Sequence, residues 1–275
     1  MRTLTNSALQ CFHSCHKKYD IQYRHRCRPI VEAAPLTIGT AFHSWVETGI
    51  VPCLDDDDAR CLVWAMIKAY SCHYQDDAPL DFMAKEQTIK APLRNPSTGM
   101  PSRTFTRAGK CDGVVRRDGG LLLYELKTTG VDIDTVVSQL RRGTQLATYA
   151  GIYREQYPDQ TIDGAIVDVV RKPRLKRRKD EDDGEYANRL AYKMLEDKDT
   201  SFRRELLPWS EQLIDETDQL YWDTAKLIRY CDKHGYTAAR GAHCKSFFGG
   251  CEYRRLCWYS INDGYRISDK EHEEL

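Results

Sequence analysis

Two carboxylates and one amine have the spacing that best fits a catalytic site. Asp112 lies in the segment GKCDG (109–113), and Glu125 and Lys127 lie in YELKTT (124–129). Between them, Asp118-Gly119 separates two apolar runs, the strongest local signal for a β-hairpin. A two-residue turn there places Asp112 opposite Glu125, with Lys127 on the same face, whereas a three-residue turn would separate the carboxylates.

This polar face predicts phosphodiester hydrolysis. Two neighbouring carboxylates repel each other, and a divalent cation with hard oxygen ligands, Mg²⁺ or Mn²⁺, offsets that repulsion. Such a cation polarises a phosphoryl oxygen and activates water. The ammonium of Lys127 would orient that water or stabilise charge developing on the phosphate. The alternative is an ordinary cross-strand ion pair on a solvated sheet face.

These segments resemble the D…(D/E)xK core of the PD-(D/E)XK nuclease superfamily, in its RecB-like branch. Three more segments resemble motifs of that branch: GTAFH (39–43) its GxxxH motif, QLATY (145–149) its QxxxY motif, and SAL…CHKKY (7–19) its N-terminal helix. The order and approximate spacing match from residue 7 to residue 149. An ordered set of motifs is more specific than any one of them.

The resemblance implies a set of metal ligands. His43 would bind the cation with Asp112 and Glu125, and the backbone carbonyl of Leu126 would add an oxygen. Glu86 lies where related nucleases often carry an acidic residue on the strand before the hairpin. Without the resemblance, His43 would be interpreted as a packed polar residue.

The resemblance also gives catalytic roles to Gln145 and Tyr149. At positions i and i+4 of a helix they share one face. From that face the amide and the phenol would position a DNA phosphate or Lys127. Without the resemblance, they would be a helix surface with one half-buried tyrosine.

The cysteines indicate a second metal centre. A reducing compartment has few disulfides, so clustered cysteines among eleven suggest metal binding. Cys244, Cys251 and Cys257 form a triplet, and the iron–sulfur members of the family imply Cys15 as the fourth ligand, with Cys11 as its rival. We expect a structural [4Fe–4S] cluster, with zinc as the alternative. The spacing of the triplet differs from that of AddB-type and CRISPR-adaptation exonucleases, in which the gap between the first two cysteines is shorter.

A basic run at 171–179 is the candidate for nucleic-acid contacts. It resembles a strand end of phage-type RecB-like nucleases and would make binding salt-dependent. Because acidic residues follow at 180–183, a self-neutralising loop is an equal alternative. The candidate phosphate-binding residues are Arg171, Lys172, Arg174, Lys176, Arg177 and Arg178.

Several elements must position these residues. The periodicity predicts the hairpin over 105–128 and a strand over 166–170. We expect five helices: 7–24 with Ser7 as N-cap, one starting near Ile38, one following Asp55 to Asp58, one over 134–157 weakened at Gly143, and one over 210–234 closed by Gly235.

Length and composition favour one soluble domain. The chain has 275 residues, 41% of them hydrophobic, and its net charge is zero, so attraction to nucleic acid must be local. It has no apolar run long enough for a membrane span and no signal peptide, so we expect no membrane partner and a cytoplasmic location. Within the single domain 1–275 we distinguish an N-terminal helix (1–30), a catalytic core (38–170), a charged loop and helical region (171–235) and a cysteine-rich tail (236–275).

The resemblance therefore implies an α/β fold of the restriction-endonuclease type: a central mixed sheet flanked by helices, a helical insertion and a cluster-bound C-terminal tail. It implies a metal-dependent DNA exonuclease acting on single-stranded or unwound ends in recombination, repair, phage replication or CRISPR adaptation. The alternatives are a non-catalytic nucleic-acid-binding module with zinc or a cluster, and a nuclease subunit latent until a helicase or integrase partner binds.

Overall fold

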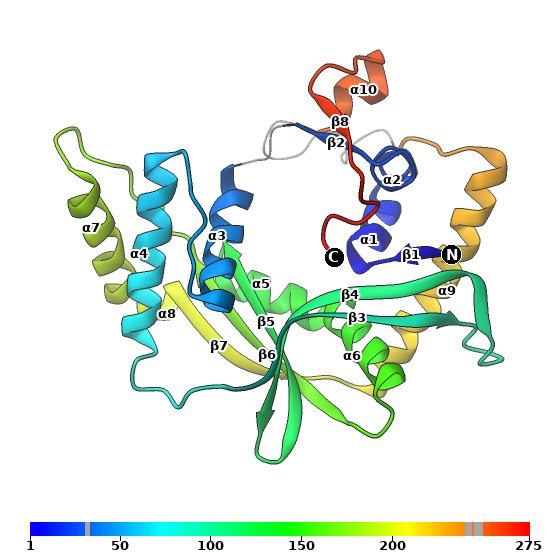
Figure 1. Cartoon of the computed structure of the whole chain (residues 1–275), viewed down its shortest axis with the longest axis horizontal. Coiled ribbons are helices and arrows are strands. Elements are labelled where there is room, and N and C mark those ends of the chain that lie inside the picture. Colours follow the sequence, from blue (N-terminus) through cyan, green and yellow to red (C-terminus); the bar gives the residue numbers. More distant parts are fainter. Residues whose placement is uncertain (31–33, 240–243, 245–249) are drawn as a thin grey trace.

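A mixed six-stranded sheet forms the centre of the molecule (Figure 1). The computed structural model describes residues 1–30, 34–239, 244 and 250–275. The strands run in the order β1-β4-β5-β6-β7, and β3 also pairs with β4. β1–β4 and β5–β6 are parallel pairs, and the others are antiparallel. The strand bounds are β1 (Arg2–Leu4), β3 (Asp81–Arg94), β4 (Pro101–Arg117), β5 (Gly120–Thr129), β6 (Ile162–Arg171) and β7 (Phe202–Pro208).

Helices cover both faces of this sheet, which confirms the predicted α/β class. One face packs on α3 (Ala34–Thr48), α4 (Asp57–His73) and α7 (Asp183–Glu196), with Phe42, Met66 and Leu190 fully buried. The other face packs on α5 (Ile133–Arg142) and α6 (Thr144–Gln156). Along β5, Tyr124 and Leu126 face the first layer while Leu123 faces the second, the alternation that a strand requires.

A third layer holds the N-terminal segment against a long helix. α1 (Asn6–Ser14), α2 (His16–Tyr19) and the π-helix η1 (Asp20–Arg24) pack on α9 (Glu211–His234) and on the ends of β3 and β4. A separate ribbon pairs β2 (Cys27–Pro29) with β8 (Tyr265–Ile267). The remaining short helices are α8 (Lys198–Ser201) and α10 (Arg254–Tyr259).

The hairpin has the predicted two-residue turn. Asp118 and Gly119 both have positive φ, 51° and 83°, as a type I′ turn requires. The strand pairing runs from Arg117 opposite Gly120 to Gly113 opposite Tyr124. The next position along this register brings Asp112 to Glu125.

Two helix predictions need correction. The predicted helix 7–24 is divided at Cys15, whose φ of −166° is extended, and its N-cap is Thr5 rather than Ser7, because the Thr5 hydroxyl accepts from the Ala8 N–H at 3.1 Å. The predicted helix 134–157 is two helices. Gly143 is extended between them, and a side chain there would meet the Gln139 carbonyl at 2.7 Å.

The region predicted as helical after residue 171 also contains a strand. β7 pairs antiparallel with β6 and completes the sheet. The predicted helix over 210–234 is confirmed as α9, capped by the Ser210 hydroxyl. Its buried stripe includes Thr217, Thr224 and Cys231, whereas Leu227 is exposed.

None of the helices in the described ranges is long and apolar enough to cross a membrane.

Candidate active site

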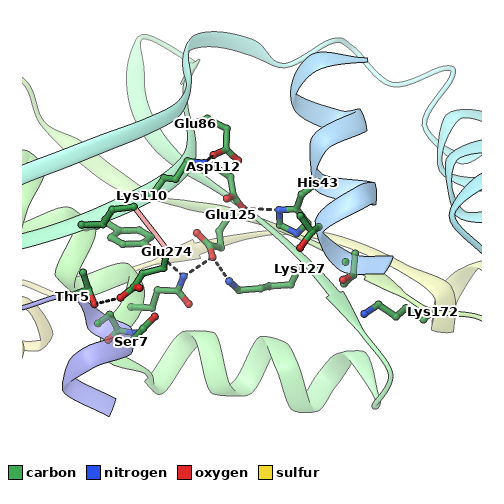
Figure 2. A pocket seen from close by; sticks show the side chains of 18 residues that line it. Thr5, Ser7, His43, Glu86, Lys110, Asp112, Glu125, Lys127, Lys172 and Glu274 are labelled. Carbon is green, nitrogen blue, oxygen red and sulfur yellow. Dashed lines mark hydrogen bonds and ion pairs between the residues drawn. The ribbon is translucent and has the colours of Figure 1, made fainter. Parts of the chain in front are cut away.

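One cavity of about 520 Å³ collects the residues predicted to do chemistry (Figure 2). It lies where α3, α1 and α6 approach the β4–β5 hairpin. The predicted residues in its lining are His43, Glu86, Asp112, Glu125, Lys127, Gln145, Tyr149 and Lys172. The structure therefore brings all the side chains of the D…(D/E)xK, GxxxH and QxxxY motifs into one place.

Asp112 is tied to the neighbouring strand. Its Oδ2 atom accepts a hydrogen bond from the backbone N–H of Leu126 at 2.7 Å. The Nδ1 atom of His43, carried by α3, lies 3.9 Å from the same oxygen. The carboxylate is thus held between β5 and α3, and the Leu126 carbonyl remains a predicted ligand.

Glu125 is the most buried charged group of the site. Its side chain is 2% exposed, and its Oε1 contacts the ammonium of Lys127. The amide of Gln145 donates to Oε1 at 2.7 Å and lies 3.0 Å from the Tyr149 hydroxyl. Oε2 is buried and has no hydrogen-bond partner. Gln145 therefore holds the carboxylate through one oxygen and leaves the other available.

Burial sets the electrostatics of these groups. It raises the pKa of Asp112 and of Glu125, and the negative charge of Asp112 raises the pKa of Glu125 further. Burial would lower the pKa of Lys127, but Glu125 raises it overall. For His43, burial and then the Lys127 charge lower the pKa to about 4, so its imidazole is neutral at pH 7.

Two glycines let helices approach the hairpin closely. A Cβ on Gly39 of α3 would lie 2.9 Å from the Thr128 hydroxyl, and one on Gly109 of β4 would lie 2.4 Å from the Tyr149 ring. The first contact brings His43 over β5, and the second brings Gln145 under Glu125. Gly39 thus allows the close approach of α3 that positions His43, and Gly109 allows the close approach of α6 that positions Gln145.

The donor set fits a hard divalent cation. A neutral imidazole and two carboxylates suit Mg²⁺ or Mn²⁺, and the buried, unpartnered Oε2 of Glu125 is an oxygen that a cation would satisfy. The Lys127 ammonium already contacts the other oxygen. Within the described ranges, no group of three or more His, Cys, Asp or Glu side chains is already arranged so that it could hold a metal ion.

The cavity also contains residues that sequence reasoning missed. Thr5, Asn6 and Ser7 come from the start of α1, and Glu274 comes from the far end of the described chain. Local patterns hold no signal for these, because their position depends on contacts between segments over two hundred residues apart. Glu86 does line the cavity, where it pairs with Lys110 and has a positive φ of 47°.

The basic run after β6 divides into two parts. Lys172 reaches the cavity, and Arg171 and Arg174 line a neighbouring hollow with it. Arg177 instead pairs with Asp58 and Asp183 at 3.0 and 2.8 Å. Arg174, Lys176 and Arg178 are exposed. Their contact with nucleic acid stays a prediction.

The four candidate cluster cysteines come from separate parts of the chain. Cys15 accepts from the Ala239 N–H at 3.3 Å, and the Cys251 N–H bonds to the Cys244 carbonyl at 3.2 Å. Burial, then the nearby thiols of Cys15, Cys244 and Cys251, raise the pKa of Cys257. The rival, Cys11, is buried and its thiol faces Gln22. Residues 240–243 and 245–249 of the predicted tail lie outside the described residues.

The fold and the site together define a nuclease. The sequence matches the profile of the PD-(D/E)XK nuclease superfamily over residues 3–258. The chain therefore belongs to this superfamily. No curated protein matches the sequence.

One solved structure supports the fold, and two others resemble it more distantly. A candidate exonuclease from Eubacterium rectale superposes with a TM-score of 0.50 at 12% identity, covering 92% of each chain. A phage-related exonuclease from Haemophilus somnus covers 85% of this chain and 96% of its own, with a TM-score of 0.38 and 10% identity. An alkaline exonuclease from Laribacter hongkongensis covers 84% and 92%, with a TM-score of 0.31 and 12% identity.

Proposed function

We propose that this nuclease is a metal-dependent DNA exonuclease acting on single-stranded or unwound ends. The observation that carries the proposal is the gathering of Asp112, Glu125, Lys127 and His43 in one open cavity, with Gln145 fixing Glu125. Carboxylates, a neutral imidazole and an ammonium are the groups that phosphodiester hydrolysis requires.

Each side chain has a distinct part in this proposal. His43, Asp112 and Glu125 would hold Mg²⁺ or Mn²⁺, which supplies positive charge to polarise the phosphodiester and acidify water. Lys127 orients the attacking water and stabilises charge developing on the phosphate. Gln145 keeps Glu125 aimed at the cation, and Tyr149 supports Gln145 from the same helix face.

Two observations favour a DNA end as the substrate. The structural neighbour from Eubacterium rectale, which superposes with a TM-score of 0.50, is described as a candidate exonuclease. The cavity continues to Lys172, and the exposed cations Arg174, Lys176 and Arg178 follow it in the chain. A strand leading from the cavity over this basic run would be held through its phosphates.

We further propose that Cys15, Cys244, Cys251 and Cys257 bind a [4Fe–4S] cluster, with zinc as the alternative. Cys251 and Cys257 pack against the same apolar cluster, and the Cys251 N–H bonds to the Cys244 carbonyl, which supports the proximity of the three tail cysteines. The cluster would have a structural role, joining the N-terminal helices to the tail. A helicase or integrase partner, in recombination, repair, phage replication or CRISPR adaptation, would be a separate chain.

Degradation of end-labelled DNA tests the nuclease proposal. With Mn²⁺ we expect the wild type to shorten single strands, and Lys127→Ala to lower the rate by roughly a hundredfold to ten-thousandfold while retaining DNA binding. Lys90→Ala, which removes an exposed lysine of β3, is the matched control.

The same assay separates the alternatives. Binding that survives EDTA, without cleavage by folded protein, would support a non-catalytic module. Cleavage that starts only after a helicase or integrase is added would support a latent subunit. A Lys127→Ala variant that cuts like the wild type would refute the site.

A further inference from the structure

Residues 268–275, here called the acidic arm, fold back onto the N-terminal segment. Arg28 and His272 are 6% and 8% exposed and anchor the arm. Arg28 donates to the Glu271 carbonyl at 2.9 Å, and His272 Nε2 lies 3.0 Å from the Thr3 carbonyl. Beyond β8 the arm contains no helix or strand, and side-chain contacts hold it in place together with a backbone hydrogen bond from the Ser268 N–H to the Arg26 carbonyl.

The arm places a carboxylate in the catalytic cavity. Glu274 lines the cavity with Asp112 and Glu125, and in Figure 2 it lies beside Thr5. Its Oε1 accepts from the Thr5 hydroxyl at 2.6 Å and lies 3.1 Å from His272 Nδ1.

Glu274 carries a negative charge at neutral pH. Burial alone would raise its pKa, but the hydrogen bonds of His272 and Thr5 lower the pKa overall. The carboxylate therefore presents an anion on a surface that, in the proposed function, receives the phosphates of a DNA strand.

We propose that the acidic arm is autoinhibitory: Glu274 occupies part of the strand path and must move aside before DNA binds. This inference rests on the proposed nuclease function. Like charges at short range repel strongly where solvent is partly excluded, so carboxylate and phosphate compete for the same space. Displacing the arm would also free the Thr5 hydroxyl, which already faces the cavity, for the strand.

The contact reaches the catalytic groups through α1. Thr5 is the N-cap of α1, and the next residue, Asn6, accepts from the Thr144 hydroxyl at 2.6 Å. Thr144 precedes Gln145, the partner of Glu125. A chain of four residues, Thr5, Asn6, Thr144 and Gln145, therefore connects the acidic arm to the side chain of Glu125.

Glu274→Gln and Asp269→Asn form a matched pair for the test. Each removes one negative charge from the acidic arm, but Asp269 is exposed and does not line the cavity. Affinity for a labelled single-stranded oligonucleotide is measured with Ca²⁺ in place of Mg²⁺, at low and high salt, beside a cleavage assay with Mn²⁺. We expect Glu274→Gln to bind roughly threefold to tenfold more tightly at low salt, with a smaller gain at high salt, and Asp269→Asn to stay within about twofold of the wild type.

Hydrogen exchange gives a second readout that a purely structural role would not produce. We expect the oligonucleotide to speed amide exchange in 268–274 of the wild type while protecting the cavity residues. Unchanged or weaker binding by Glu274→Gln, or an arm that stays protected on DNA, would overturn autoinhibition even if the wild type cleaves DNA. Absence of both binding and cleavage in all three proteins would overturn the nuclease proposal itself.

Discussion

At the scale of single residues, the site depends on how Glu125 is held. One oxygen of this buried carboxylate contacts Lys127 and Gln145, and the other has no hydrogen-bond partner. The carboxylate is therefore fixed in orientation but can still accept a ligand on its second oxygen. This arrangement needs Gln145, because a carboxylate held by Lys127 alone could rotate with that flexible side chain. The amide therefore has a positioning role rather than a direct one.

We predict that Gln145→Ala lowers kcat by roughly tenfold to a hundredfold, the range that misplacement of a reacting group produces. KM should change little, because Gln145 acts through Glu125. Tyr149→Phe, which removes the hydroxyl beside Gln145 but keeps the ring, should have a smaller effect. Steady-state kinetics on a labelled strand measures both.

Gln156→Ala is the control, since Gln156 is exposed on the same helix, outside the cavity. If Gln145→Ala raised KM and left kcat unchanged, the amide would contact substrate instead of positioning Glu125.

At the scale of elements, the approach of α6 to β4 decides where Gln145 lies. The Tyr149 ring occupies the space that a side chain at Gly109 would fill. Gly109→Ala forces the ring or the helix away, and overpacking of this kind costs about 1–3 kcal/mol of unfolding free energy. We expect urea titrations to show this loss of unfolding free energy and cleavage assays to show a lower rate.

Gly130→Ala is the matched control, because a Cβ at Gly130 has no heavy atom within 4 Å. Its unfolding free energy should stay within about 0.5 kcal/mol of the wild type. A stable, fully active Gly109→Ala protein would show that α6 adapts without moving Gln145.

The elements also show how much of the fold could be predicted from the sequence. The hairpin register followed from Asp118-Gly119, and with it came the neighbouring positions of Asp112 and Glu125. β7 was missed because its sequence, FRRELLP, lacks an apolar alternation: Arg204 lies within the sheet and pairs with the buried Asp168 at 2.8 Å. A tertiary ion pair replaces the apolar side chain that a sequence pattern would detect.

Contacts between distant segments could not be predicted from the sequence, for a similar reason. Ser7 looked like the N-cap, but Thr5 caps α1 and also bonds to Glu274. Nothing near Thr5 in the sequence indicates the acidic arm. Local propensity fixes elements and register, whereas the docking of residues 268–275 depends on Arg28 and His272 finding partners across the chain.

At the scale of the whole molecule, the proposed cluster would connect the two ends of the fold. Cys15 lies between α1 and α2, and Cys251 and Cys257 lie close to η1 and β2. A cross-link between segments so far apart in sequence restricts the unfolded chain, by about 3–5 kcal/mol for loops of this size. The same connection would support the surface on which the acidic arm docks.

We therefore predict that anaerobically purified protein is brown, contains iron, and absorbs near 400 nm, roughly as cysteinyl iron–sulfur proteins do. Cys251→Ser should lose iron and unfold at lower temperature, whereas Cys72→Ser, at an exposed position of α4, should retain both properties. Colourless protein with one zinc per chain would identify the site as zinc. A metal-free Cys251→Ser protein as stable and active as the wild type would refute a structural cluster, and the N-terminal layer would then be held by its packing on α9, β3 and β4 and by its ion pairs with Asp232.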